Sequence, residues 1–333
     1  MGLLVNGSWF EETRAERAER EKRGEEIPAQ RQFRHWVTAD GRPGPGSDKS
    51  YPAAAGRYHL YICHACPWAH RTMIARALKG LDQAIGVSVT NWFMGEQGWN
   101  FEPGDGVVDD PVWGVRYLHE LYSKADPGFT GRVTVPVLLD LETKTIVSNE
   151  SADILRMFGS AFDTVAANPG LDLYPTPLRK TIDAINDRVF DTVNAGVYKA
   201  GFAIEQAQYA KAAGEIFTTF DWLEDILSRQ RYVAGDRLTE ADIRLFTTLL
   251  RFDPVYHGHF KCNLRRLVDY PNLWNYTRDI YQRPGVAATV NLTHIQHHYY
   301  ESMNNINPAR IVPIGPAIDY SLPHDRDRLP RAA

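Results

Sequence analysis

Cys66 is the residue best placed to do chemistry. It follows the β-rich run Tyr58–Ile62 by four residues and directly precedes Pro67. Proline is favoured in the first turn of a helix, so Cys66 is expected at a helix N-terminus. The free N–H groups and the dipole of that helix end stabilise a thiolate, which is the nucleophilic form. The position therefore predicts a nucleophilic cysteine, and the alternative is a small, inert, buried side chain.

Cys63 turns the local sequence into a formal C-x-x-C. A dithiol redox pair would place its second cysteine three residues after the one that starts the helix, where this chain has Ala69. The pattern is therefore monothiol. Zinc could in principle use the two cysteines with His64 and His70, but no second C-x-x-C or paired-histidine motif supplies a matching half, so we predict no metal site. Cys262 is isolated and is interpreted as structural.

Two further segments offer groups to a ligand. Pro136 opens a strand after the β-branched Val135, and a cis bond there would turn the preceding backbone outward to pair with an extended peptide. A trans proline at a sheet edge is the alternative. Glu150 and Ser151 precede a helix, where a carboxylate suits an ammonium group and a hydroxyl with free N–H groups suits a carboxylate. As isolated residues these two would only cap the helix.

The elements expected around these residues form a small mixed sheet with helices on its faces. Strands are predicted at residues 58–62, 85–89, 133–140 and 145–147. Helices are predicted from Pro67 toward the stop signal Gly80, at 117–124 and at 152–158. Residues 92–113, rich in glycine, aspartate and aromatic residues, are expected to be an inserted structured loop. The order is β-α-β-α-β-β-α, which is an α/β domain.

The second half of the chain is predicted to be all-α. Residues 168–177 read as a linker, and helical patterns follow at 178–197, 204–229, 239–252 and 271–282. Thr239 and Asp242 form a capping box with aspartate in place of the usual glutamate, which we interpret as a folding signal rather than a catalytic pair. The expected organisation is an extension over residues 1–55, domains over 56–165 and 176–300, and a tail over 301–333.

The extension differs in composition from the rest. Residues 11–26 are dense in charged side chains, which is typical of a solvated helix or a flexible arm. The run Gly41–Ser47 consists of residues that break helices and strands. Aromatic side chains at Trp9, Phe10, Phe33 and Trp36 indicate that the extension is wrapped on, or tethered to, the main body.

Composition excludes several classes. The chain has 333 residues, of which 44% are hydrophobic and 23% charged, with a net charge of −4. This is ordinary for a soluble globular protein, not for a collagen-like, disordered or disulfide-rich one. Near-neutral charge argues against nucleic acid as a partner. With no apolar run of about 20 residues and no signal peptide, the expected location is the cytoplasm.

These features together resemble the glutathione transferase superfamily, with a thioredoxin-like N-terminal domain and an all-helical C-terminal domain. More narrowly, the chain is similar to the glutathionyl-hydroquinone reductases, or xi class. The resemblance is carried by Cys66–Arg71, Gly98-Trp99, Gly131–Leu138 and Ser148–Ser151, and by the tail segments His298–Tyr300, Ile306–Pro308 and Ile314–Pro316. It spans nearly the whole chain, the extension included.

The resemblance implies roles for residues of the first domain. Cys66 would be the nucleophile. Val135 would pair with the backbone of glutathione, Glu150 and Ser151 would take its γ-glutamyl end, and Arg132 would supply positive charge for an anionic ligand. The full set implied to hold glutathione is Trp99, Arg132, Val133, Thr134, Val135, Glu150 and Ser151.

In the family, tyrosines of the helical domain line the hydroquinone pocket. Judged by the residues that flank them in the sequence, these tyrosines match Tyr198, Tyr256 and Tyr299. Tyr299 is chosen over its neighbour Tyr300. Tyr198 would serve as the proton donor or acceptor, and the other two would donate hydrogen bonds to the thiolate or the ring oxygen.

The implied activity is glutathione-dependent reduction of S-glutathionyl-hydroquinones. It would proceed through a Cys66–glutathione mixed disulfide that a second glutathione resolves, with no metal or nucleotide. If Cys63 can reach that mixed disulfide, it could resolve it internally, and the cycle would then not be purely monothiol. The alternatives are an omega-like thioltransferase or dehydroascorbate reductase, and a non-enzymatic binding module that would keep its function without Cys66. Because members of the superfamily are usually homodimers, the resemblance also implies a homodimer.

Overall fold

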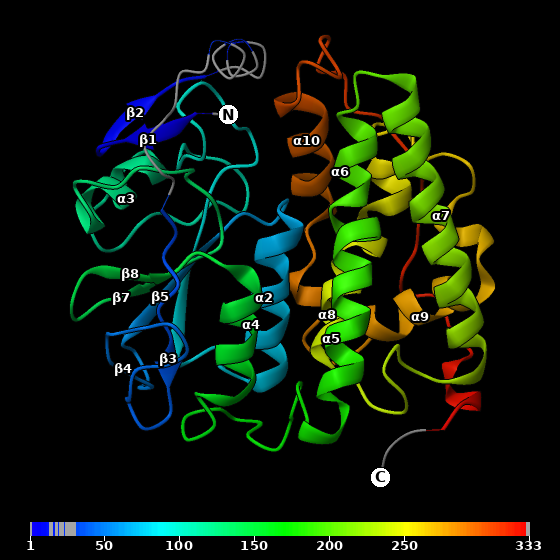
Figure 1. The fold of residues 1–333 in the computed structure, drawn as a ribbon, viewed down its shortest axis with the longest axis horizontal. Coiled ribbons are helices and arrows are strands. Elements are labelled where there is room, and N and C mark those ends of the chain that lie inside the picture. The colour runs from blue at the N-terminus through cyan, green and yellow to red at the C-terminus, as the bar shows by residue number, and fades with distance from the viewer. Residues whose placement is uncertain (1, 13–15, 17–18, 20–22, 24–30, 331–333) are drawn as a thin grey trace. The chain divides into compact units, whose positions relative to one another are not determined.

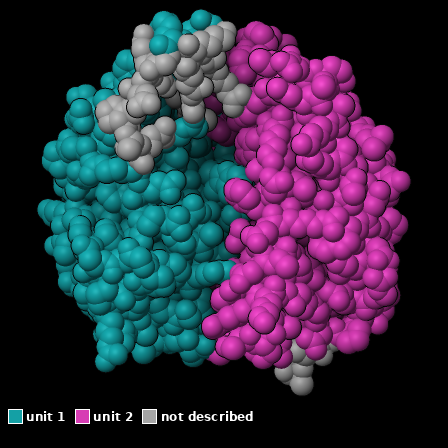
Figure 2. Space-filling view, viewed as in Figure 1, with its two compact units in different colours: residues 1–72, 79–169 teal, residues 73–78, 170–333 magenta. Residues whose placement is uncertain are grey.

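The structure is a computed structural model in which residues 2–12, 16, 19, 23 and 31–330 are described. It divides into two compact units, which are coloured separately in Figure 2. The first unit comprises residues 1–72 and 79–169, and the second comprises residues 73–78 and 170–333. Each unit is described here by itself.

A four-stranded mixed sheet forms the centre of the first unit (Figure 1). Its strands are β5 (Tyr58–Ile62), β6 (Ile85–Val89), β7 (Val137–Asp140) and β8 (Thr145–Ser148), in the order β6-β5-β7-β8. Strand β5 pairs parallel with β6 and antiparallel with β7. All five residues of β5 are buried, as expected for a strand with neighbours on both edges. The sheet topology confirms the predicted mixed α/β domain.

The helices of this part of the chain are α2 (Pro67–Lys79), α3 (Leu118–Ala125) and α4 (Ser151–Ser160). They begin within one residue of the predicted positions. One predicted strand start is wrong: β7 begins at Val137 and not at residue 133. Thr134 instead uses both its backbone N–H and its carbonyl in hydrogen bonds with the hydroxyl of Tyr122, so it cannot pair with a strand. The Val135-Pro136 peptide bond is cis.

The extension is attached to the first unit, as predicted. Strands β1 (Leu3–Val5) and β2 (Ser8–Phe10) form a hairpin that lies beside α3 in Figure 1, and the Trp9 ring stacks on His119 of that helix. Strands β3 (Val37–Thr38) and β4 (Tyr51–Pro52) pair in parallel. Most of the charged segment 11–26 lies outside the described residues.

The second unit is helical. Its α-helices outside residues 73–78 are α5 (Arg179–Val189), α6 (Gly196–Gly201), α7 (Gln206–Arg229), α8 (Glu240–Arg251), α9 (Pro271–Tyr281) and α10 (Leu292–Ser302). Short 3-10 turns occur at Thr176–Leu178, Leu267–Asp269, Ala287–Thr289 and Arg326–Arg328. Within the part of the chain that the structure describes, no helix is long and apolar enough to cross a membrane.

One helical prediction is wrong, and one helix has no corresponding prediction. The single helix expected over 178–197 is divided, because a π-helical turn at Phe190–Asn194 separates α5 from α6; the N–H of Ala195 donates to the carbonyl of Phe190 at 2.8 Å. A second π-helical turn, Phe252–Tyr256, follows α8. Helix α10 was not predicted, because its sequence of histidine, tyrosine and glutamine has no clear apolar stripe.

The capping box that opens α8 is confirmed. The backbone N–H of Thr239 donates to the Asp242 carboxylate at 2.7 Å, and the Thr239 side chain accepts from the backbone of the third helical residue. Asp242 also accepts from the N–H of Val233 at 2.9 Å and from the Tyr276 hydroxyl at 2.8 Å. Both members of the box are fully buried. It thus joins the start of α8 to α9 inside the helical unit.

Candidate active site

Cys66 lies where β5 turns into α2, as the sequence predicts. The N–H of Ala69, in the first turn of α2, donates to Sγ of Cys66 at 3.5 Å, and Sγ lies 3.6 Å from the carbonyl oxygen of Val135. The side chain keeps 8% exposure. A free N–H directed at sulfur and the positive end of a helix both favour thiolate over thiol. The Val135 contact brings the sulfur to the segment predicted to bind a tripeptide.

Cys63 has a different environment. Its side chain is fully buried, and Sγ lies 3.8 Å from the carbonyl oxygen of Asn91. Burial, followed by the nearby Cys66, raises the pKa of Cys63 to about 12. All three cysteines are free thiols. At neutral pH Cys63 is therefore protonated and shielded, which weakens the idea that it resolves a disulfide formed on Cys66.

The segment Arg132–Val135 is held by one hydroxyl group. Tyr122 donates from Oη to the carbonyl of Thr134 at 2.8 Å and accepts from the Thr134 N–H at 3.3 Å. Val133 and Val135 are buried, whereas Arg132 is exposed. The Tyr122 hydroxyl is fully enclosed, and burial raises its pKa, so it stays protonated as the donor. This hydroxyl therefore fixes the backbone next to Val135.

Glu150 and Ser151 form the N-terminus of α4. The Glu150 carboxylate accepts from the N–H of Ala152 at 3.0 Å and lies 3.4 Å from the Ser151 hydroxyl. The buried guanidinium of Arg71 donates to Ser151 Oγ at 3.5 Å and lies 4.5 Å from the centre of the Trp68 ring. A carboxylate, a hydroxyl and a helix N-terminus at one point suit the amino acid end of a ligand.

Trp99 belongs to the loop between β6 and α3. It is 7% exposed, and its carbonyl accepts from the N–H of Leu118 at the start of α3 at 2.9 Å. Asparagine side chains order this loop: Asn91 donates to the carbonyl of Glu102 at 3.0 Å, and Asn100 donates to that of Phe93 at 2.9 Å. The loop that carries Trp99 is thus built by its own polar contacts.

In the second unit, the three predicted tyrosines lie together. The Tyr299 hydroxyl is 2.5 Å from that of Tyr198 and 2.8 Å from that of Tyr256. Tyr299 is 1% exposed and Tyr256 fully buried, whereas Tyr198 is half-buried. Burial raises the pKa of Tyr299 well above its ordinary value. Tyr299 therefore stays protonated, and Tyr198 alone of the three keeps appreciable exposure.

Tyr300 is separate from this chain of three tyrosines. Its hydroxyl donates to the carbonyl of Pro254 at 3.4 Å, and its ring lies 4.5 Å from that of His259.

The π-helical turns position two of the clustered side chains, since Tyr256 ends one turn and Tyr198 follows the other by four residues. Such turns are frequent at functional sites.

Sequence reasoning missed three supporting residues. Arg71 and Asn149 stand inside the motifs that carry the resemblance but have no predicted role of their own, and no sequence pattern marks Tyr122. Asn149 donates from Nδ2 to the Tyr122 hydroxyl at 3.2 Å. Each acts through a contact between different elements of the fold, so no local pattern identifies it.

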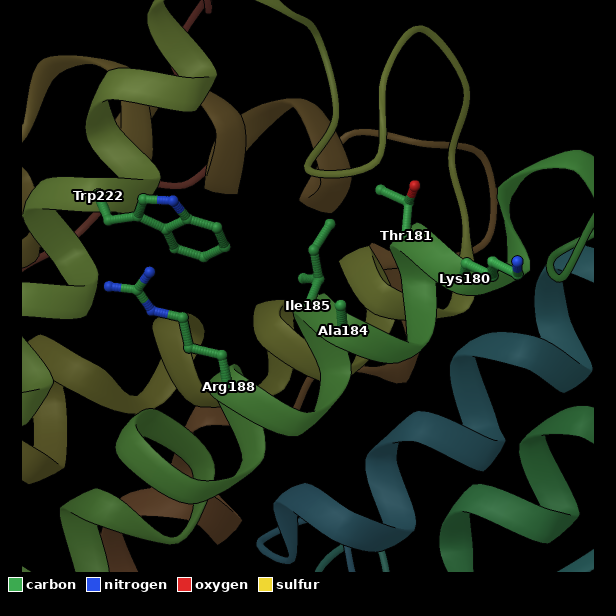
Figure 3. A pocket seen from close by; sticks show the side chains of 6 residues that line it. All are labelled: Lys180, Thr181, Ala184, Ile185, Arg188 and Trp222. Atoms are coloured by element: carbon green, nitrogen blue, oxygen red, sulfur yellow. The ribbon is translucent and has the colours of Figure 1, made fainter.

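A cavity of about 380 Å³ lies elsewhere in the second unit, between α5 and α7 (Figure 3). Arg188 lies 4.0 Å from the centre of the Trp222 ring beside it. The remaining lining residues are Lys180, Thr181, Ala184 and Ile185, and none belongs to the predicted site. Among the described residues, no group of three or more His, Cys, Asp or Glu side chains could hold a metal ion.

Comparisons with known proteins agree on one family. The family models of the N-terminal and C-terminal domains of glutathione S-transferases match residues 65–161 and 206–279. Glutathionyl-hydroquinone reductase YqjG of Escherichia coli (strain K12) is 50% identical over 98% of this chain and 99% of its own length. Glutathionyl-hydroquinone reductase PcpF of Sphingobium chlorophenolicum is 50% identical over 95% of this chain and 97% of its own length.

Solved structures give the same result. The xi-class transferase of Natrialba magadii superposes with a TM-score of 0.91 at 47% identity, covering 100% of this chain and 98% of that one. The glutathione-bound structure of YqjG from Escherichia coli K-12 has a TM-score of 0.89 at 49% identity, covering 98% of this chain and 99% of that one. The chain therefore belongs to the glutathionyl-hydroquinone reductases, the xi class of the glutathione transferase superfamily.

Proposed function

We propose that this protein reduces S-glutathionyl-hydroquinones to hydroquinones with glutathione as co-substrate. The observation that carries the proposal is Cys66, the one of the three thiols that keeps any exposure, at the N-terminus of α2 beside the Val135 carbonyl. The two reductases that share 50% of its residues over nearly its whole length support the same activity.

The proposed reaction has two steps at sulfur, of which only the second is a thiol–disulfide exchange. The Cys66 thiolate attacks the glutathione sulfur of the conjugate, so that an S–S bond forms and the bond from sulfur to the ring carbon breaks. The electron pair of the broken bond goes to the ring carbon, which takes up a proton. A second glutathione, as thiolate, then attacks the mixed disulfide and releases glutathione disulfide and free Cys66. The ring is reduced and two glutathione sulfurs are oxidised, so electrons balance.

In this proposal the first unit binds the glutathione half of the substrate. Val135 pairs with the tripeptide backbone, and Glu150 with Ser151 receives its γ-glutamyl end. The contacts of Tyr122 with Thr134 and of Arg71 with Ser151 support these assignments, because they hold the two segments in fixed positions. Exposed Arg132 supplies positive charge, and Trp99 and Val133 complete the proposed set.

The tyrosine chain serves the ring in this proposal. Carbon is a poor leaving atom, so the ring must pass through a keto form, which requires a proton donor and acceptor. Half-buried Tyr198 takes that role. Tyr299 supplies a hydrogen bond to the Tyr198 hydroxyl and not to the thiolate or ring oxygen directly, and Tyr256 supplies one to Tyr299. The raised pKa of Tyr299 supports a neutral donor at physiological pH.

An omega-like thioltransferase is the second candidate. A protein of Schizosaccharomyces pombe named glutathione S-transferase omega-like 2 is 44% identical over 86% of this chain and 93% of its own length. Both candidates use Cys66, but only the reductase needs the tyrosine chain. A non-enzymatic binding module needs neither.

The test is incubation with glutathione and a glutathionylated hydroquinone. We expect one free hydroquinone and one glutathione disulfide per turnover, with no product from Cys66→Ser and normal product from the matched control Cys262→Ala. Efficient reduction of simple mixed disulfides without hydroquinone release would instead establish the thioltransferase. We also propose a cytoplasmic location and a homodimer, which fractionation and sedimentation equilibrium would test.

A further inference from the structure

The extension contacts the chain beside Arg132. Leu4 and Gly131 exchange both backbone hydrogen bonds, each 2.9 Å long, so β1 pairs with the segment that leads to Arg132. On its other side, Gly131 approaches the extension again: a Cβ added to it would lie 2.8 Å from the carbonyl oxygen of Arg31. Two parts of the extension therefore enclose this one residue, and only glycine fits between them.

The hairpin also contacts the loop that carries Trp99. Trp9 donates from Nε1 to the carbonyl of Glu96 at 3.3 Å. Its ring lies against Gly98, where an added Cβ would be 3.1 Å from the indole, and it stacks on His119 at 4.7 Å. His119 in turn lies 3.1 Å from the Gln97 side chain. Trp9 thus contacts Glu96 and Gly98 directly and reaches Gln97 through His119.

A third contact reaches the start of α4. Phe33 and Asn149 exchange two hydrogen bonds, from the Asn149 N–H to the Phe33 carbonyl at 3.1 Å and from the Phe33 N–H to Asn149 Oδ1 at 3.2 Å. Arg34 forms a two-point ion pair with the mostly buried Asp153 in the first turn of α4, at 2.5 and 3.1 Å. Asn149 also donates to the hydroxyl of Tyr122, which in turn donates to the carbonyl of Thr134.

We propose that the extension is a positioning element of the glutathione site: it holds the three loop segments 98–99, 131–135 and 149–151 in their binding geometry. This inference rests on the proposed function, because it takes those segments as the glutathione ligands. The segments lie outside the regular pairing of the sheet, so their order depends on contacts with neighbouring elements. Without the share of those contacts that the extension supplies, part of the ordering would fall to glutathione itself. Ordering backbone during binding costs affinity.

The test uses two single variants and their combination. Trp9→Ala removes the contact with the Trp99 loop, and Arg34→Gln removes the ion pair with Asp153. Arg42→Ala is the matched control, because Arg42 belongs to the extension and its exposed guanidinium pairs with the exposed Asp40. Glutathione affinity is measured by calorimetry, and KM and kcat are measured in the hydroquinone assay.

We expect each single variant to raise the Kd and KM for glutathione about fivefold or more, and the double variant to raise them further. The kcat at saturating glutathione and the rate of Cys66 alkylation without glutathione should stay close to wild type, as should Arg42→Ala throughout. If a variant does not fold, Trp9→Phe and Arg34→Lys take its place. Variants that melt earlier but bind glutathione as tightly as wild type would overturn the inference.

The same titration separates the two proposals. Wild-type protein that binds no glutathione would overturn the proposed function and the inference together. Wild-type protein that binds glutathione, with Trp9→Ala and Arg34→Gln binding equally well, would overturn the inference alone.

Discussion

Alkylation of the native protein should modify one cysteine of three. Burial raises the pKa of both Cys63 and Cys262 to about 12. At pH 8 only about one in 10,000 of these thiols would be ionised, against roughly a quarter of an ordinary cysteine with a pKa near 8.5. Cys66 keeps 8% exposure at a helix N-terminus, while the other two side chains are fully buried. Iodoacetamide should therefore react with Cys66 at least roughly a thousandfold faster.

The assay is intact mass spectrometry over time at pH 8, with and without denaturant. The native protein should gain one adduct, and the denatured protein three. Cys63 and Cys66 fall in one tryptic peptide, Tyr58–Arg71, so fragmentation must assign the site. Cys66→Ser should abolish the fast phase, and Cys262→Ala should leave it unchanged. Modification of native Cys63 at a rate near that of Cys66 would refute the reasoning and reopen a dithiol cycle.

Three further perturbations test other parts of the structure. Tyr299→Phe removes both hydroxyl contacts but keeps the ring, so hydroquinone kcat should fall about 10- to 100-fold with the melting temperature nearly unchanged; an unchanged kcat would exclude the chain from catalysis. Asp242→Ala leaves two buried N–H groups and the Tyr276 hydroxyl without their acceptor, and denaturant unfolding should show a loss of roughly 2–4 kcal/mol. His259 is buried, which lowers its pKa to about 4. Because the unfolded state binds a proton first, stability should fall by about 2 kcal/mol as pH drops from 6.5 toward 4, and His259→Gln should flatten that profile in thermal melts.

The parts of the fold that could be predicted are those fixed by local sequence. Strand β5 has the predicted bounds because its five buried residues form one β-rich run. Helix α2 begins at Pro67 because proline is favoured in the first turn of a helix. The start of β7 could not be predicted, because the hydroxyl of Tyr122 takes up the backbone groups of Thr134. Hydrophobic periodicity also does not report the extra residue of a π-helical turn.

In the candidate site, too, features fixed by local sequence could be predicted and contacts between separate segments could not. Cys66 could be identified from its neighbours because a helix N-terminus is a local feature. The choice of Tyr299 over Tyr300 stays a prediction. In the structure the Tyr299 hydroxyl contacts those of Tyr198 and Tyr256, whereas the Tyr300 hydroxyl donates to the carbonyl of Pro254. The contacts made by Asn149 and by the extension could not be predicted, because they join segments that lie at least 27 residues apart.

Under the proposed function, the number of hydroxyl protons decides which tyrosine donates and which accepts in each hydrogen bond of the chain. A hydroxyl donates one hydrogen bond, so Tyr299 can donate to only one of its two partners and must accept from the other. If Tyr198 donates to the ring, it has no proton left for Tyr299 and must accept from it. Tyr299 must then accept from Tyr256. An oxyanion left on Tyr198 would be stabilised by one short hydrogen bond, itself strengthened by the fully buried Tyr256 behind it. Tyr256 thus acts through Tyr299, and its loss should slow the reaction less than the loss of Tyr299.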